Sequence, residues 1–397
     1  MRTQVLIVLL SCLIFWITNS FLEGNMNSRD RLAKELQVGT WEHFDEWKSD
    51  EKAPFKYRIL FSTLVDASTK LFSSSKYYNR NFYYIYCIIS MALMASVPLV
   101  FHQLLKIAGF NNFECWLGIF FLFISPAFLL AYTLPVHTKE DMLGYLLLCS
   151  ALIFLIKEKD YFFCMTAILG VITRETLMVL PFIYLFFSKA SFSKKIVICS
   201  LPILSLILLR LSLGLESYNM AQGFSWNVSR PFQILGFGFL CFHILWAPFF
   251  LGLSKKKSEE PNISFFRKSA LPVITLIIMT TFLFGQFNEI RLQFLGFPWI
   301  IINALMFFRL NRLRILDIAV SSKYKIYITF IISLFTVFII GFIKNYEGYF
   351  SFENRYNVPV DLWLIVLFIF IGLQVIILPF LTSSNNSFKL DKANKSK

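Results

Sequence analysis

The sequence has little charge, little histidine and no paired cysteine spacing. Only 16% of its 397 residues are Asp, Glu, Lys or Arg, whereas a soluble domain has roughly 25%. The four histidines include no two at metal-ligand spacing, and most of the seven cysteines fall inside apolar runs. Neither a metal site nor a disulfide framework is therefore predicted. Because the apolar runs do not alternate with a period of two, the pattern also excludes a β-barrel.

The dominant feature is instead a series of long apolar runs. The chain is 57% hydrophobic and contains 47 Phe, and its mean hydropathy is +0.63. Runs of about 20 apolar residues predict membrane-spanning helices, so the predicted fold class is all-α, a polytopic membrane helical bundle. The net charge of +14 lies mostly in short loops between these runs, which indicates topology determinants and no nucleic-acid partner.

The apolar runs predict about 10–12 transmembrane helices in a single integral membrane domain over residues 1–381. The first run is too long for the apolar core of a signal peptide, so we expect an uncleaved helix. The polar tail, 382–397, is expected to be disordered and cytoplasmic. The predicted spans are 4–22, 82–104, 113–134, 142–156, 161–173, 176–187, 196–213, 232–253, 269–286, 292–308, 326–343 and 360–381.

Two of these spans are short, and they flank Arg174–Glu175. One continuous helix over 161–187 is the alternative. The basic residues before this region (Lys157–Lys159) and after it (Lys189 to Lys195) both favour the cytoplasmic side. Two cytoplasmic flanks require an even number of crossings between them. We therefore expect two short, broken helices that meet on the outer side, with both chain termini in the cytoplasm.

The same threading places residues 23–81 outside as a long extracytoplasmic loop with short amphipathic helices, one of them over Ser28–Val38. Near its end, Arg58 stands between Tyr57 and the start of an apolar helix. A guanidinium there can bind a lipid-linked phosphate with a two-pronged contact. Snorkelling towards lipid headgroups is the alternative explanation.

Three charged pairs lie at ends of apolar runs: Glu140–Asp141, Arg174–Glu175 and Glu289–Arg291. Charges at membrane depth cost several kcal/mol and are therefore candidates for functional sites. Each pair also has a local explanation, helix capping for the first and third and a structural ion pair for the second. The threading places all three on the outer face, where acids and arginines together suit binding of a lipid phosphate and activation of a nucleophile.

In their order along residues 1–310, these segments resemble the bacterial branch of the GT-C superfamily of polytopic glycosyltransferases. Each similarity is a short motif beside an apolar helix. The motifs are Phe55-Lys56-Tyr57-Arg58-Ile59-Leu60, Lys139-Glu140-Asp141, Thr173-Arg174-Glu175-Thr176 with Pro181, and Asn288-Glu289-Ile290-Arg291 with Pro298.

The resemblance implies a GT-C-like bundle in a bacterial inner membrane, with its active site on the non-cytoplasmic face. The donor would be a polyprenyl-phosphate-linked sugar, and the other partners would be membrane lipids. In this family an acid of the first outer loop acts as the base or positions the acceptor, and Asp30 is the first choice for that acid and Asp45 the second. Glu140 or Asp141 would form a second acidic site. A divalent cation is optional.

By the same resemblance, three arginines would hold the donor phosphate: Arg58, Arg174 and Arg291. Four neighbours would support them: Tyr57, Lys139, Glu175 and Glu289. The predicted activity is an inverting transfer of the sugar to an acceptor.

Two other functions remain open. A carrier or flippase for lipid-linked precursors needs the same arginines but no base, and it needs a polar path through the bundle. Spans 196–213 and 326–343 offer almost none beyond Arg210. A non-catalytic membrane protein of envelope assembly would use loop 23–81 as a docking surface.

Overall fold

A computed structural model describes residues 2–23, 57–72, 78–125, 127–128, 140–215, 245–254, 260–285 and 290–311, with single positions between 224 and 242. Every element within these ranges is helical, and none of them contains a strand. The all-α class is thereby confirmed. Asp30, Asp45, Ser28–Val38, both spans after residue 311 and the tail lie outside the described residues.

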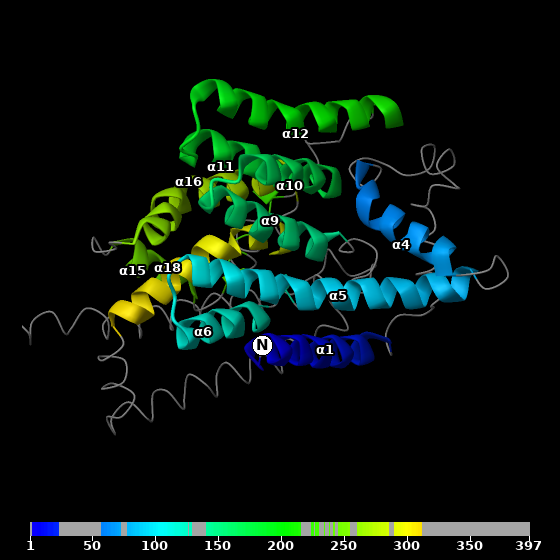
Figure 1. Ribbon diagram of the computed structural model, residues 1–397, viewed down its shortest axis with the longest axis horizontal. Coiled ribbons are helices and arrows are strands. Elements are labelled where there is room, and N and C mark those ends of the chain that lie inside the picture. Colours follow the sequence, from blue (N-terminus) through cyan, green and yellow to red (C-terminus); the bar gives the residue numbers. More distant parts are fainter. Residues whose placement is uncertain are drawn as a thin grey trace, which may run out of the picture.

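Figure 1 shows the described helices in their order along the chain. Their bounds are α1 Arg2–Glu23, α4 Ile59–Phe72, α5 Tyr78–Ile107, α6 Asn112–Phe123, α9 Asp141–Ile156, α10 Asp160–Thr173, η4 Glu175–Met178, α11 Val179–Phe187, α12 Phe192–Leu213, α15 Trp246–Ser254, α16 Pro261–Phe284, α17 Ile290–Gln293, η6 Phe294–Gly296 and α18 Phe297–Leu310.

Four stretches are long and apolar enough to cross a membrane: Tyr84–Ile107, Phe192–Leu213, Pro261–Leu283 and Arg291–Leu310. Their burial differs sharply. In the stretch that contains α18, 94% of the apolar window is buried inside the protein, against 22% for α12. In a membrane protein, an outer helix contacts lipid and a central helix contacts other helices. Helix α18 is therefore central in the bundle, and α12 is peripheral.

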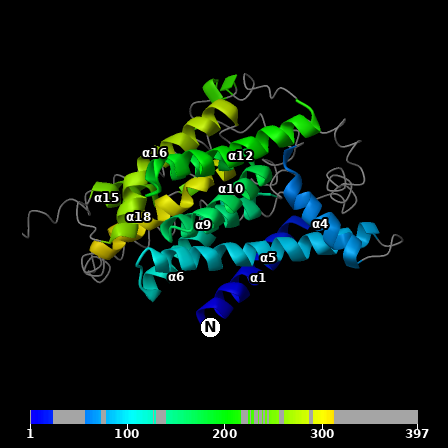
Figure 2. The same ribbon diagram turned by 45° about the horizontal axis from the view of Figure 1, so that its top comes forward.

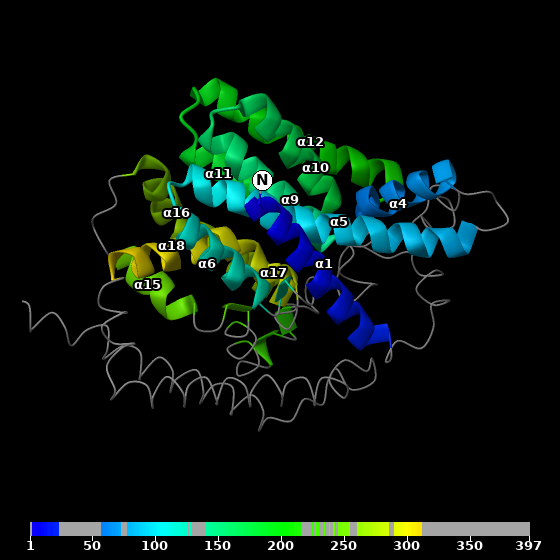
Figure 3. The same cartoon turned by 60° about the horizontal axis from the view of Figure 1, so that its bottom comes forward.

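The packing order follows from the contacts between helices. The long helix α5 contacts α1, α4, α6 and α9, while α10 lies between α9 and α12. Figure 1 shows α12 along one edge of the molecule and α1 along the other. The turned view in Figure 3 shows α1 crossing α5 obliquely. Helix α18 packs against α6, α15 and α16, and all these helices enclose one continuous apolar core.

The contact between α15 and α18 requires a glycine. A Cβ atom placed on Gly252 would lie 2.1 Å from the backbone oxygen of Asn303, much closer than carbon and oxygen can approach. The missing side chain lets the two backbones touch. A larger residue here would force the helices apart.

The region around Arg174 is a helical hairpin. Helix α10 ends at Thr173, Arg174 has extended backbone (φ −161°, ψ 126°), and the 3-10 turn η4 leads into α11. The ring centroids of Phe163 and Tyr184 are 4.7 Å apart, whereas a continuous helix would separate these residues by about 30 Å. The predicted reversal between two short helices is thus confirmed.

Some predicted boundaries were wrong. The span predicted at 113–134 ends as α6 at Phe123, shortly before the Ser125-Pro126 step, because a residue that precedes proline avoids helical backbone. Helix α16 begins at Pro261, eight residues before the predicted 269, since proline is favoured in the first turn of a helix. The predicted span 292–308 is interrupted at its start by η6.

Candidate functional site

Six charged side chains meet at one end of the bundle. They come from four separate segments: the residue before α4, the start of α9, the break between α10 and α11, and the four-residue helix α17. We call this cluster the Arg174 network. Its members are Arg58, Glu140, Asp141, Arg174, Glu175 and Arg291.

Arg58 joins two of the segments. Its Nη1 lies 2.6 Å from Oε1 of Glu140, and its Nε lies 3.3 Å from Oε2 of Glu175. Glu140 occupies the N-cap position of α9, yet its side chain makes no capping hydrogen bond. Capping therefore does not account for this carboxylate, which binds an arginine 82 residues away in the sequence.

Asp141 joins the other two segments. One carboxylate oxygen pairs with Nη1 of Arg174, and the other lies 3.4 Å from Nη1 of Arg291. One turn further along α9, the hydroxyl of Tyr145 donates to the backbone oxygen of Arg291 at 3.1 Å. Helix α9 therefore fixes both the backbone and the side chain of Arg291.

The central side chains of the Arg174 network are almost completely shielded from solvent. Asp141 is 0% exposed, and Glu140 and Arg174 are each 1% exposed. Removing such charges from water costs several kcal/mol per ion, and a buried ion pair is often no more stabilising than apolar residues of the same size. With three arginines and three carboxylates the cluster is formally neutral, but stability alone is a weak reason for it.

Local backbone geometry brings Arg174 to this position. Its N–H donates to the oxygen of Gly170 at 2.8 Å, and its own oxygen accepts from the N–H of Leu177 at 3.0 Å. A Cβ on Gly170 would lie 3.2 Å from Cδ1 of Leu177, so this glycine admits the returning chain. The turn is tight, and it points Arg174 inwards.

Two polar atoms beside the network lack partners. Within the part of the chain that the structure describes, Oε1 of Glu175 and the hydroxyl of Thr176 are buried and make no hydrogen bond. Buried polar groups are nearly always satisfied, so these two atoms add to the reasons for taking the network as a candidate site. A carboxylate oxygen and a hydroxyl together suit the hydroxyl group of a ligand. Thr176 was not singled out from the sequence, where only the neighbouring charge pair gave a signal.

Tyr57 directly precedes Arg58 and joins the chain to the end of α12. It is buried, and its hydroxyl donates to the oxygen of Gly214 at 2.9 Å. Lys139 and Glu289 lie outside the described residues, as do the two first-loop acids. The structure thus brings together Arg58, Arg174 and Arg291 with Glu140, Asp141 and Glu175, and their catalytic and donor-binding roles stay predictions.

The described residues do not form a metal site. They include no group of three or more His, Cys, Asp or Glu side chains that could hold an ion. The carboxylates of the Arg174 network face guanidinium groups instead of one another. The optional divalent cation thus has no ligand set among these residues.

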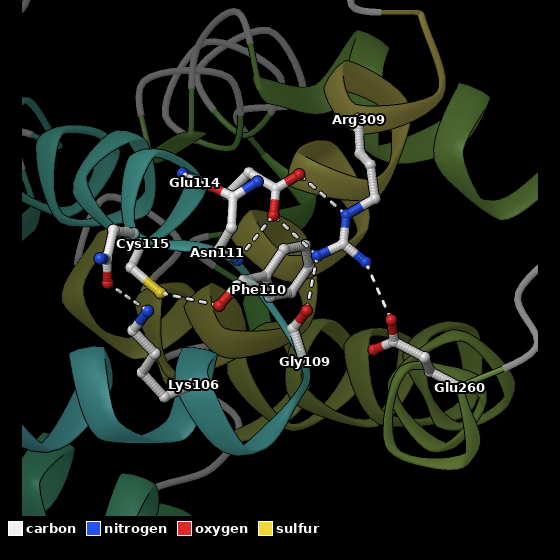
Figure 4. A network of polar contacts seen from close by, with 9 residues as sticks. Lys106, Gly109, Phe110, Asn111, Glu114, Cys115, Glu260 and Arg309 are labelled. Carbon is white, nitrogen blue, oxygen red and sulfur yellow. Dashed lines mark hydrogen bonds and ion pairs between the residues drawn. The ribbon is translucent and has the colours of Figure 1, made fainter.

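A second network lies at the other end of α18 and is drawn in Figure 4. Arg309 donates to both carboxylate oxygens of Glu114, at 2.8 and 2.7 Å, and to the backbone oxygen of Gly109 at 2.7 Å. Its guanidinium also lies 3.4 Å from Glu260 and 4.5 Å from the ring centroid of Phe110. We call this cluster the Arg309 network.

Comparison of the chain with protein-family models, with curated proteins and with solved structures found no match. The functional argument therefore rests on the residues of the site.

Proposed function

We propose that this protein is a membrane glycosyltransferase that moves a sugar from a polyprenyl-phosphate donor to an acceptor on the non-cytoplasmic face of the membrane. The observation that carries the proposal is the Arg174 network, in which three arginines and three carboxylates from four segments meet in a buried cluster.

The arginines suit the donor phosphate. A guanidinium binds phosphate oxygens through two parallel N–H donors and stays charged when buried. As the bond between sugar and phosphate breaks, negative charge develops on the phosphate, and positive groups already fixed in place stabilise that charge. Glu140 and Asp141 hold Arg58, Arg174 and Arg291 in position, so we assign them a positioning role.

The reaction is a displacement with inversion at the anomeric carbon. The acceptor oxygen forms a bond to that carbon and gives its proton to a carboxylate, for which Asp30 and Asp45 remain the candidates. The bond from the anomeric carbon to the phosphate oxygen breaks, and its electron pair leaves with the lipid phosphate. Because phosphate is a good leaving group, no general acid is required.

The charge of the loops supports the orientation. The hairpin α10–α11 has basic residues at its open end, where Lys189 Nζ lies 2.8 Å from Glu158, and the Arg174 network at its closed end. The positive-inside preference puts the open end in the cytoplasm. The network then faces the same side as loop 23–81.

A deletion strain tests the function. We expect it to accumulate the polyprenyl-phosphate sugar and to lose one glycan product, both measured by mass spectrometry of extracted lipids and glycans. Wild-type protein should restore the product and Arg174→Ala should not, at equal membrane levels. Lys268→Ala, at an exposed position of α16, is the control and should restore it fully. An unchanged lipid and glycan profile in the deletion strain would refute the proposal. A product made on the opposite face would indicate a carrier instead.

A further inference from the structure

The C-terminal half of helix α12 carries one charged residue, Arg210, among mostly apolar side chains. Three large exposed side chains of α12, Ile196, Ile203 and Ile207, precede Arg210 by 14, 7 and 3 residues, so they form an apolar stripe on the same face of the helix as Arg210. Only 22% of the apolar window of this helix is buried, so the stripe faces lipid. Arg210 lies beside the stripe in the last turn.

Within the described part of the chain, Arg210 has an aromatic neighbour but no carboxylate partner. Its guanidinium carbon lies 4.9 Å from the ring centroid of Tyr57, a cation–π distance. Among the described residues it forms no ion pair, and its Nε is buried without a hydrogen-bond partner. An unpaired cation on a lipid-facing helix is costly, and it marks a candidate site for an anion.

The end of α12 is joined to the start of α4 separately from the main core. Tyr57 and Leu213 form a small apolar cluster of their own, with Ile59 and Leu209 packed against it. The hydrogen bond from Tyr57 to Gly214 closes the same junction. The two helix ends lie side by side in all three ribbon views, most clearly in Figure 2. We call this junction the α12–α4 seam.

The seam leads directly to the Arg174 network, because the residue that follows Tyr57 is Arg58. One face of Tyr57 is thus covered by an arginine on the lipid side, while the next residue binds Glu140 and Glu175 inside. The guanidinium of Arg210 thus lies over the ring of Tyr57, while the guanidinium of the next residue, Arg58, belongs to the Arg174 network.

We infer that the α12–α4 seam is the binding site through which a polyprenyl phosphate enters from the membrane, with its phosphate on Arg210 and its chain along the stripe of α12. The inference rests on the proposed function. The charge of Arg210 complements the phosphate, and the apolar stripe complements the isoprenoid chain. The guanidinium, whose carbon lies over the ring of Tyr57, offers several N–H donors to phosphate oxygens.

Photolabelling tests the seam. The full-length protein is placed in phosphatidylcholine nanodiscs with a photoreactive polyprenyl phosphate, and labelled peptides are mapped by mass spectrometry. We expect label on the wild type between residues 196 and 213. Arg210→Gln should reduce the labelling about tenfold. Lys195→Gln removes a charge from the other end of the same helix and should change labelling less than about twofold.

Competition separates the possible anions. Unlabelled polyprenyl phosphate should suppress labelling, while phosphatidylglycerol and inorganic phosphate at the same concentration should not. Equal suppression by phosphatidylglycerol would mean that Arg210 only contacts common headgroups, and equal suppression by inorganic phosphate would mean a site for a soluble anion. Either result overturns the inference, and so does unchanged labelling of Arg210→Gln.

Two further measurements keep the outcomes distinct. Arg210→Lys retains the charge without the planar stack and should label about threefold less than wild type, provided that its thermal unfolding midpoint is unchanged. If the wild type labels at the seam but the deletion strain keeps its glycan product, the proposed function fails and the lipid site stands. If the product is lost but label falls elsewhere, the seam fails and the function stands.

Discussion

The two arginine networks contain the same residue types but differ in burial and in what their side chains bind. Arg309 closes a surface turn, with its side chain 25% exposed and Glu260 50% exposed. Its main partner, Glu114, also forms a reciprocal capping box with Asn111 at the start of α6. Arg174, by contrast, is 1% exposed, and neither Glu140 nor Arg174 caps a helix through its side chain.

The difference teaches how to separate a structural ion pair from a candidate site. In the Arg309 network the carboxylate and guanidinium satisfy orphan backbone groups at the ends of helices, which is a sufficient reason for their presence. In the Arg174 network the charged side chains pair with one another. Among the described residues, one carboxylate oxygen of Glu175 and the hydroxyl of Thr176 have no hydrogen-bond partner. Burial together with unpartnered polar atoms therefore distinguishes the Arg174 network as the candidate site.

The largest expected effect is that of Arg174→Ala. It removes one of the two guanidiniums that bind Asp141 and leaves a buried, under-compensated carboxylate. We expect the free energy of unfolding in detergent to fall by about 3–5 kcal/mol, and the glycan product to be lost. The double variant Asp141→Asn with Arg174→Gln removes both charges and should recover at least half of the stability but none of the product. A double variant as unstable as the single one would contradict the electrostatic explanation.

Arg309→Gln should have a smaller effect. The substitution breaks two charged hydrogen bonds to Glu114 and one to Gly109, but water reaches the partners that remain. We expect a loss of about 2 kcal/mol in the free energy of unfolding, with normal product per folded molecule. The wild-type contribution of Arg309 should weaken in high salt, since partly exposed pairs are screened. If Arg309→Gln lost the glycan product at wild-type abundance of folded protein, the Arg309 network would not be purely structural and the contrast with the Arg174 network would fail.

Gly109→Ala tests the backbone of the same surface turn. Gly109 has φ +94°, and a Cβ there would lie 1.7 Å from Oε2 of Glu260. The mobile end of Glu260 can move away, so the cost is chiefly the left-handed backbone, about 1–2 kcal/mol. Gly144→Ala is the matched control, because its Cβ would meet Leu177 at an ordinary 3.6 Å. Thermal unfolding of both variants should show a decrease only for Gly109→Ala.

The smallest effect on stability should come from Glu175→Gln. Its side chain is 18% exposed, and its contact with Arg58 is the longer of the two that this arginine makes. We expect less than about 1 kcal/mol of destabilisation but at least a tenfold loss of product. Normal product from this variant, measured at equal folded abundance, would remove Glu175 and its unpartnered oxygen from the site.

Part of this arrangement could be predicted from sequence. Apolar run lengths gave the helical class, and the basic residues around Lys157 and Lys189 required the chain to reverse near Arg174. The cost of charge at membrane depth marked Arg174–Glu175 and Glu140–Asp141 as unusual. These signals are local in the chain, so they can be recognised from one sequence.

The pairing inside the network could not be predicted in the same way. Glu140 binds Arg58 across 82 residues, and Asp141 is shared between Arg174 and Arg291 because α9 packs between segments that are distant in the chain. Capping was an equally good local explanation for Glu140. Only tertiary packing decides between a capping bond and a partner on another helix. The irregular start of α18 likewise depends on neighbours that sequence periodicity does not reveal.

The short arms of the hairpin have a consequence for the surrounding lipid. Helix α10 has 14 residues and α11 has 9, so even the longer arm covers only about 21 Å at 1.5 Å per residue. An ordinary hydrocarbon layer is about 30 Å thick. A bilayer that thins beside the hairpin would match its length. Such thinning would bring water closer to the buried arginines, and the proposed lipid donor would still keep its chain in the hydrocarbon layer.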